Sequence, residues 1–183
     1  MVAGVAFTKY RQWIADQIQH AERASAKGKQ DWKGTKNPKQ RIDYLERIFA
    51  IEDLKGTIFY AAYENHEKDY WSYTVDALSI AVARFAQNSH SFIRHQGFNY
   101  KTREKLKAHL RMSGASFEIQ SGADKRCEIR LADALAGFIG VVKYSGSDSA
   151  NLYPDIPEWF VDLKNEAPIQ GLPVGASQSP GIE

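Results

Sequence analysis

The chain has 183 residues, 24 Lys and Arg against 22 Asp and Glu, 43% hydrophobic residues and one cysteine. This length and apolar content are typical of one globular domain and exclude a disordered chain. The lone Cys127 excludes an intramolecular disulfide and a cysteine-based zinc site, which favours a reducing compartment. No stretch approaches the roughly 18 apolar residues of a membrane helix, so we expect a cytoplasmic protein without a membrane partner.

The spacing of apolar residues switches repeatedly between two and about 3.6, which is typical of alternating strands and helices. The pattern predicts strands at 2–7, 57–63, 91–95 and 116–120. It predicts helices at 10–24, from Asn37-Pro38 to before Gly56, and at 70–86, 102–112 and 127–142. This order predicts an α/β domain of three layers, in which a mixed or mostly parallel sheet is flanked by helices.

Two helices carry clear signals in their sequence. Trp13, Ile14 and Ile18 share one face of the first helix, which we expect to be its buried side. Asn37-Pro38 is a strong helix start, because the Asn side chain accepts free N–H groups and proline lacks an N–H. A polar loop is expected at 28–35, between these two helices.

Five of the six prolines lie at or after Pro154, and 167–183 is rich in Pro, Gly and Ser. We therefore expect the α/β domain to span 1–150 and a Pro-rich extension to span 151–183. Within the extension, 157–163 is predicted to form a short helix that docks Trp159 and Leu163 on the body. The remainder is predicted to be a mobile tail.

The net charge of +2 conceals an uneven distribution. Residues 27–41 carry a formal charge of +5, from six Lys and Arg and one Asp, and residues 94–111 also carry +5, from six Lys and Arg and one Glu. Residues from 150 onward carry −4. Each positive segment also contains aromatic residues, which a protein that binds a phosphate backbone needs; the alternative is ordinary solvated lysine.

The stretch 31–36, Asp-Trp-Lys-Gly-Thr-Lys, places an acid beside lysines in the loop before a well-capped helix. A carboxylate at Asp31 would help to hold Mg²⁺, while Lys33 and Lys36 would pair with phosphate oxygens. The alternative is a polar loop with a local side-chain turn.

Asp133 stands in an otherwise nearly apolar helix and shares a helical face with Ile129, Ala136 and Gly137. We therefore expect it to be partly buried, and a buried carboxylate requires a partner. A Lys or Arg cation and a metal ion are equally compatible with the sequence. The five histidines have no zinc-ligand spacing, there is no phosphate-binding glycine loop, and Cys127 is most simply a small core residue.

These two stretches carry a family resemblance. Residues 129–138, Ile-Arg-Leu-Ala-Asp-Ala-Leu-Ala-Gly-Phe, are similar to the closing I-x-L-A-D-x-x-A-G motif of the bacterial domain-of-unknown-function family 3800. Residues 31–36 resemble its E-x-K-[GW]-S-K motif, with Asp in place of Glu. The resemblance covers 2–142 and implies a ribonuclease-H-like fold and a metal-dependent nuclease.

Members of that family place four carboxylates at their centre, and this chain supplies two, Asp31 and Asp133. The opening Y-I-D-E-S-G strand is not present, so the resemblance implies an N-terminally incomplete fold that starts on the second or third strand. The middle-strand acid is also missing, because Arg94 or Gln96 stands there. A sheet without its first strand would expose an edge, through which we expect homo-oligomers.

The resemblance and the charge pattern together predict a set of site residues. Asp31 and Asp133 are the predicted catalytic residues and ligands of Mg²⁺, with Mn²⁺ as the alternative metal. The predicted contacts to nucleic acid are Lys33, Lys36, Lys39, Arg94, Lys101 and Arg130. Two metal ions require several carboxylates to hold them and to offset their charge. The alternative to a nuclease is therefore a catalytically degenerate or truncated member that serves as a nucleic-acid-binding or protein-binding module.

Overall fold

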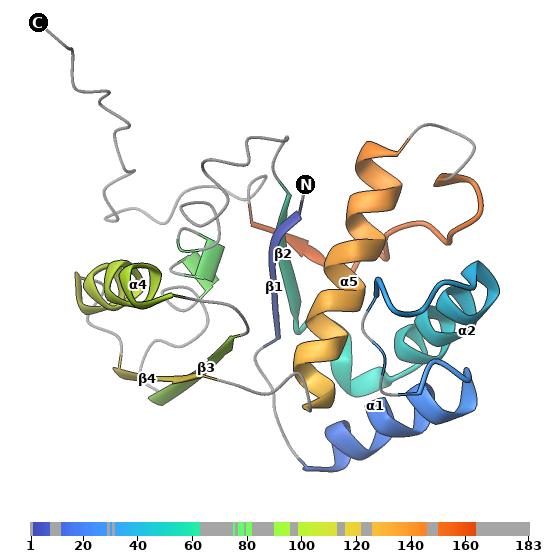
Figure 1. Cartoon of the computed structure of the whole chain (residues 1–183), viewed down its shortest axis with the longest axis horizontal. Coiled ribbons are helices and arrows are strands. Elements are labelled where there is room, and N and C mark those ends of the chain that lie inside the picture. The colour runs from blue at the N-terminus through green and yellow to red at the C-terminus, as the bar shows by residue number, and fades with distance from the viewer. Residues whose placement is uncertain are drawn as a thin grey trace, which may run out of the picture.

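The structure is a computed structural model that describes residues 2–7, 12–28, 30, 32–62, 75, 77–78, 80–81, 90–95, 99–112, 116–121, 126–145 and 150–163. The strands are β1 (Val2–Phe7), β2 (Ile58–Ala62), β3 (His90–His95), β4 (Ser116–Ser121) and β5 (Val161–Asp162). The helices are α1 (Gln12–Ala24), α2 (Pro38–Phe49), the short 3-10 helix η1 (Glu52–Leu54), α4 (Tyr100–Met112) and α5 (Cys127–Tyr144) (Figure 1). Residues 75, 77–78 and 80–81 are also helical, within the helix predicted at 70–86.

The strands form two sheets. In the first, β2 lies between β1, which is antiparallel to it, and β5, which is parallel to it, so this sheet is mixed. The described strands therefore do not form the one sheet that the sequence predicts. In the second, β3 and β4 are parallel, with His90 opposite Ser116 and His95 opposite Ser121. Helices and strands are thus combined in a mixed α/β arrangement.

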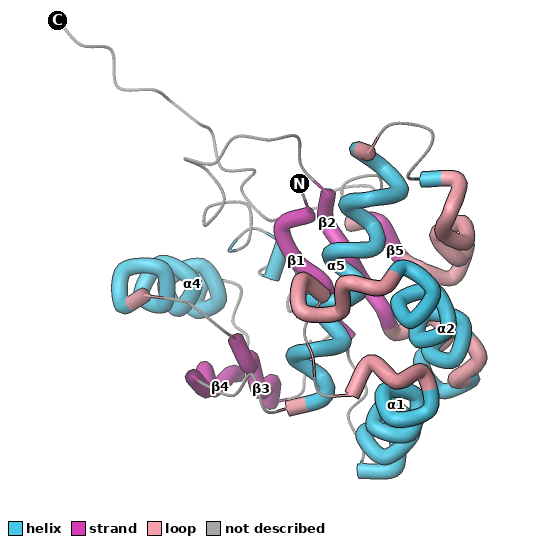
Figure 2. The backbone as a smooth tube through the Cα atoms, turned by 45° about the vertical axis from the view of Figure 1, so that its right-hand side comes forward, coloured by secondary structure: helices cyan, strands magenta, loops and turns pink. Residues whose placement is uncertain are grey.

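Helices cover both faces of the first sheet. Side chains alternate along a strand, and in β2 the side chains of Ile58, Tyr60 and Ala62 join the main core, which contains α1, α2 and α5. Phe59 and Ala61 point to the opposite side, where they pack with Ala77, Ala81 and Leu163. Helix α5 contacts both β1 and α1, and Figures 1 and 2 show it between the first sheet and the pair α1 and α2.

The helix signals of the sequence are confirmed for α2 and partly wrong for α1. Asn37 caps α2, because its Oδ1 accepts the Lys39 N–H at 3.0 Å, and Pro38 is the first helical residue. In α1, Ile14 and Ile18 are buried, but Trp13 is 40% exposed and does not share their environment.

The helix predicted at 157–163 is wrong. Residues 158–159 form a turn, and Val161–Asp162 form β5, whose neighbour Leu163 donates its N–H to the Tyr60 carbonyl at 2.8 Å. Phe160 is buried in the main core, so residues beyond 150 pack into the same body as the predicted domain. The predicted mobile tail, 164–183, lies outside the described residues.

None of the described helices has the length and apolar character to cross a membrane.

Candidate functional site

The loop at 32–36, called the Trp32 loop below, lies directly on helix α5. The backbone N–H of Trp32 donates to Oδ2 of Asp133 at 2.7 Å. The partner expected for Asp133 was a cation or a metal, whereas within the described residues its hydrogen-bond donor is a backbone N–H. The expectation of burial was also wrong, because Asp133 is exposed. An exposed position leaves the carboxylate accessible from solvent.

Gly137 makes room for the Trp32 side chain. It lies one helical turn after Asp133 on α5, so both residues face the same loop. A Cβ atom placed on Gly137 would lie 2.3 Å from Cδ1 of the Trp32 indole, far closer than atoms can approach. The glycine at position 137 is therefore required for the Trp32 side chain to pack on α5.

Arg41 of α2 holds the other side of the loop. Its Nη2 donates to the Trp32 carbonyl at 2.8 Å and its Nε to the Thr35 carbonyl at 2.5 Å. Its guanidinium also lies over the Trp32 ring, 4.4 Å from the centroid, where a cation is attracted to the aromatic face. The ring of Tyr153 also lies beside Trp32, with 5.8 Å between the two ring centroids.

Arg130, predicted to contact phosphate, is instead buried. It is 4% exposed, and its Nε and Nη2 donate to the two carboxylate oxygens of Glu22, both at 2.8 Å. This hydrogen-bonded pairing with Glu22 raises the pKa of Arg130. The Arg130 guanidinium therefore links α5 to α1 in the interior and is not at the surface, where a phosphate could reach it.

Lys27 joins the same buried cluster. Its Nζ lies 4.0 Å from Oε1 of Glu22, donates to the Gln30 carbonyl and sits 4.7 Å from the centroid of the Tyr44 ring. Burial, followed by the charge of Glu22, raises the pKa of Tyr44 well above its usual value. The cluster therefore fixes the chain just before the Trp32 loop.

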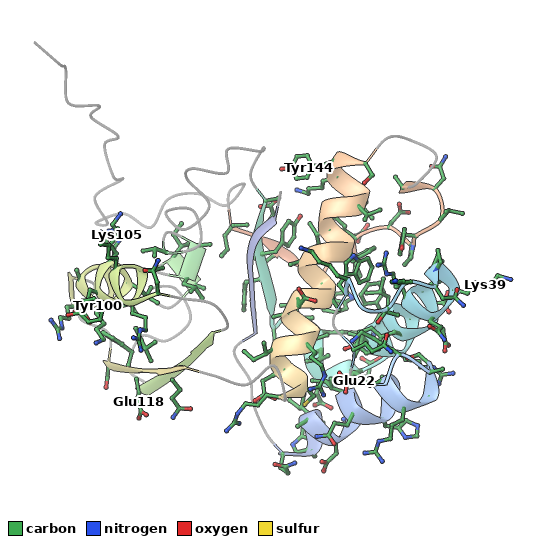
Figure 3. All side chains as sticks on the ribbon, viewed as in Figure 1. Glu22, Lys39, Tyr100, Lys105, Glu118 and Tyr144 are labelled. Atoms are coloured by element: carbon green, nitrogen blue, oxygen red, sulfur yellow. The ribbon has the colours of Figure 1, made fainter. Side chains whose placement is uncertain are left out.

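The other predicted contacts fall into two groups. Lys33, Lys36 and Lys39 are exposed on and beside the Trp32 loop. Lys101 is exposed on α4, and Figure 3 shows α4, with its labelled Tyr100 and Lys105, on the opposite side of the molecule from Lys39 of α2. Asp31 and the side chain of Arg94 lie outside the described residues.

In the described part of this site, the carboxylate that faces the loop is that of Asp133. Within the described ranges, no three residues of the His, Cys, Asp and Glu types form a group that could hold a metal ion. Mg²⁺ is commonly held by one or two carboxylates together with substrate phosphates.

Arg41, Glu22 and Lys27 were missed as organising residues of the site. They appeared in the sequence only as contributors to charge, and no local pattern distinguishes a lysine inside a core from a solvated one. Cys127, by contrast, is buried as predicted, and burial followed by the nearby Glu128 raises the pKa of its thiol to about 11.

Comparisons with family models, with curated proteins and with solved structures found no match to this chain.

Proposed function

We propose that this chain is a metal-dependent nuclease of ribonuclease-H-like fold that acts on nucleic-acid phosphodiesters. The observation that carries the proposal is the 2.7 Å contact between the Trp32 N–H and Asp133. It joins the two stretches of family resemblance, 31–36 and 129–138, although about a hundred residues separate them in the sequence.

In this proposal each residue type has a separate task. Asp31 and Asp133 would hold Mg²⁺, and the exposed Lys33, Lys36 and Lys39 would attract the phosphate groups of the substrate. The chemistry that a bound Mg²⁺ supplies is polarisation of a phosphoryl oxygen. Arg41 and Gly137 would keep the loop against α5, and so keep the two acids at a constant separation.

The test separates the charge of Asp133 from its hydrogen bond. Asn at position 133 retains an oxygen that accepts the Trp32 N–H but removes the negative charge, whereas Ala removes both. We expect Asp133→Asn to fold like the wild type and to lose at least tenfold in affinity for Mn²⁺ or Mg²⁺, measured by calorimetric titration. Cleavage of labelled RNA and DNA oligonucleotides in Mn²⁺ should fall in parallel.

Asp53→Asn is the matched control, because Asp53 is an exposed acid in η1. It should leave metal affinity and cleavage unchanged. If Asp133→Asn binds metal as tightly as the wild type, Asp133 is only the acceptor that holds the loop, and the nuclease proposal fails.

A second candidate is a nucleic-acid-binding module without catalysis. It is favoured by the engagement of Asp133 Oδ2 with a backbone N–H and by the presence of two of the four family carboxylates. This candidate predicts oligonucleotide binding that weakens steeply with salt, no cleavage in either metal, and no effect of Asp133→Asn on affinity.

A further inference from the structure

Helix α4 presents a positive surface that the candidate site does not use. The helix contains five Lys and Arg residues and one acid, Glu104. Its inner side is formed by the buried Thr102, Leu106 and Leu110, the last two packed with Val75. The exposed residues Lys101, Lys105 and Arg111 therefore lie on the outer side.

This arrangement is electrostatically unfavourable for an isolated helix. Like charges four residues apart repel by about 0.2–0.5 kcal/mol, and α4 has three such pairs. They are Lys101 with Lys105, Arg103 with Lys107, and Lys107 with Arg111. Two of these cations also stand in the first turn, at the positive end of the helix dipole, where no acid is present.

The acid on the helix relieves little of this repulsion. Glu104 accepts a hydrogen bond from Lys107 at 2.8 Å, and this contact, followed by the charges of Arg111 and Arg103, lowers the pKa of Glu104. Within the part of the chain that the structure describes, Lys101, Lys105 and Arg111 make no ion pair. A polyanionic partner would remove the repulsion that the helix retains.

Tyr100 identifies the kind of polyanion. It is 69% exposed at the first position of α4, and Asn99 fixes that position by accepting the Thr102 N–H at 2.9 Å and the Thr102 hydroxyl at 3.1 Å. An exposed aromatic ring beside cations is the combination that stacks on an unpaired base while the cations bind phosphates. Base faces are available in single strands and are covered in a duplex.

We infer that α4 binds single-stranded nucleic acid, with phosphates on Lys101, Lys105 and Arg111 and a base stacked on Tyr100. The inference rests on the proposed function for its choice of nucleic acid among polyanions, and it adds a strand preference and a second contact surface. Figures 1 and 2 show α4 on the far side of the first sheet from α2, so this surface is distinct from the candidate site.

The experiment measures binding of a fluorescent 20-nucleotide single strand and of the matching duplex by anisotropy over a range of NaCl concentrations. The variant Lys101→Gln, Lys105→Gln, Arg111→Gln should weaken single-strand binding by more than tenfold. It should also reduce the salt slope by about 2, since each lost phosphate contact removes about 0.7 from the slope for single strands. Tyr100→Ala should weaken single-strand binding by about tenfold, and Tyr100→Phe should not.

The charge-matched control replaces Arg23, Arg47 and Lys55 with Gln. These exposed cations lie on α1, on α2 and in the turn after η1, outside both proposed surfaces, and their loss should leave single-strand binding and its salt slope unchanged. Circular dichroism of every variant checks that α4 still folds. Wild-type binding by the α4 variant would overturn the inference, as would equal affinity for the duplex, or binding to phosphatidylserine vesicles without binding to oligonucleotides. Asp133→Asn separates the two proposals: if it retains metal affinity while the α4 variant loses single-strand binding, the nuclease proposal fails and the α4 surface stands.

Discussion

Trp32 is held by two helices, α2 and α5. Its backbone N–H is bound by Asp133, its carbonyl by Arg41, and its ring lies against Gly137. Trp32 is 7% exposed although its neighbour Lys33 is exposed. A single buried aromatic side chain thus anchors an otherwise polar loop, because burial of an indole offers far more contact area than any other residue of that loop.

Gly137→Ala should therefore be destabilising, although Ala is the better helix former. A new Cβ meets the indole, and forced repacking of a filled site costs about 1–3 kcal/mol. In a Trp32→Leu background the clash is relieved, and the same substitution should instead stabilise by about 0.5–1 kcal/mol through helix propensity. Urea unfolding of the four chains measures both effects, and the absence of a sign reversal would contradict the contact.

At the scale of elements, α1 is joined to α5 by a buried ion pair. Glu22 near the end of α1 meets Arg130 in the second turn of α5, and Lys27 brings a second cation to the same carboxylate. Buried charges are tolerated when each is paired and hydrogen-bonded, and removing one partner leaves an uncompensated charge in the interior. The pair therefore specifies how the two helices meet.

Arg130→Met should lower the free energy of unfolding by about 3–5 kcal/mol, because Glu22 keeps its charge with only Lys27 beside it. Arg47→Met is the control, since Arg47 and Asp43 form an i,i+4 pair in which both side chains are 42% exposed. Its loss should cost only about 0.3–0.5 kcal/mol. Equal effects of the two substitutions in urea unfolding would show that the Glu22–Arg130 pair is solvated in solution.

The elements could be predicted from sequence where the signal is local. Apolar spacing and the Asn37-Pro38 cap depend on neighbouring residues, and β1 and α5 have close to the expected bounds. Helix α2 begins at Pro38 as expected but ends at Phe49, and the separate 3-10 helix η1 follows before Gly56. The strand β5 could not be predicted, because two residues carry no period and its pairing with β2 depends on a distant segment. Pro157 and the spacing of Trp159 and Leu163 predict a helix, whereas the chain is extended there and pairs with β2.

The candidate site was predictable to the same extent. The composition of the sequence singles out Asp133 and the 31–36 stretch, and the structure brings Asp133 and Trp32 together. The sequence does not show which atoms contact Asp133, because a carboxylate can be satisfied equally by a cation, a metal or a backbone N–H. Arg130 shows the same limit. Its place in the motif predicts a contact with phosphate, whereas its partner is the carboxylate of Glu22 in another helix, α1.

At the scale of the whole molecule, positive charge lies at two ends of a single packed body. The lysines of the Trp32 loop stand beside α2, while those of α4 lie beyond the first sheet. Residues 75, 77–78 and 80–81 connect these parts, because Val75 packs with Leu106 and Leu110 whereas Ala77 and Ala81 pack on β2. A nucleic acid that contacted both surfaces would have to pass around the first sheet.

The segment 153–163 closes this body, and Phe160 is its main anchor. Its ring is 7% exposed and lies 5.7 Å from Phe49 and 4.6 Å from Trp159, measured between centroids. Lys143 of α5 further binds Asp162 at 2.7 Å, so the segment joins α2, β2 and α5. Loss of Phe160 should therefore destabilise the whole fold and not only the segment that contains it.

Phe160→Ala should lower the free energy of unfolding by about 3–5 kcal/mol, the usual cost of removing a buried phenyl ring from a packed core. Leu152→Ala, directly before this segment and 59% exposed, should change it by less than about 0.5 kcal/mol. Tryptophan fluorescence and far-ultraviolet circular dichroism in urea should show coincident transitions for Phe160→Ala, since one cooperative unit unfolds as a whole. An early fluorescence transition that leaves the helical signal intact would instead show that 153–163 is an appendage whose loss the α/β body tolerates.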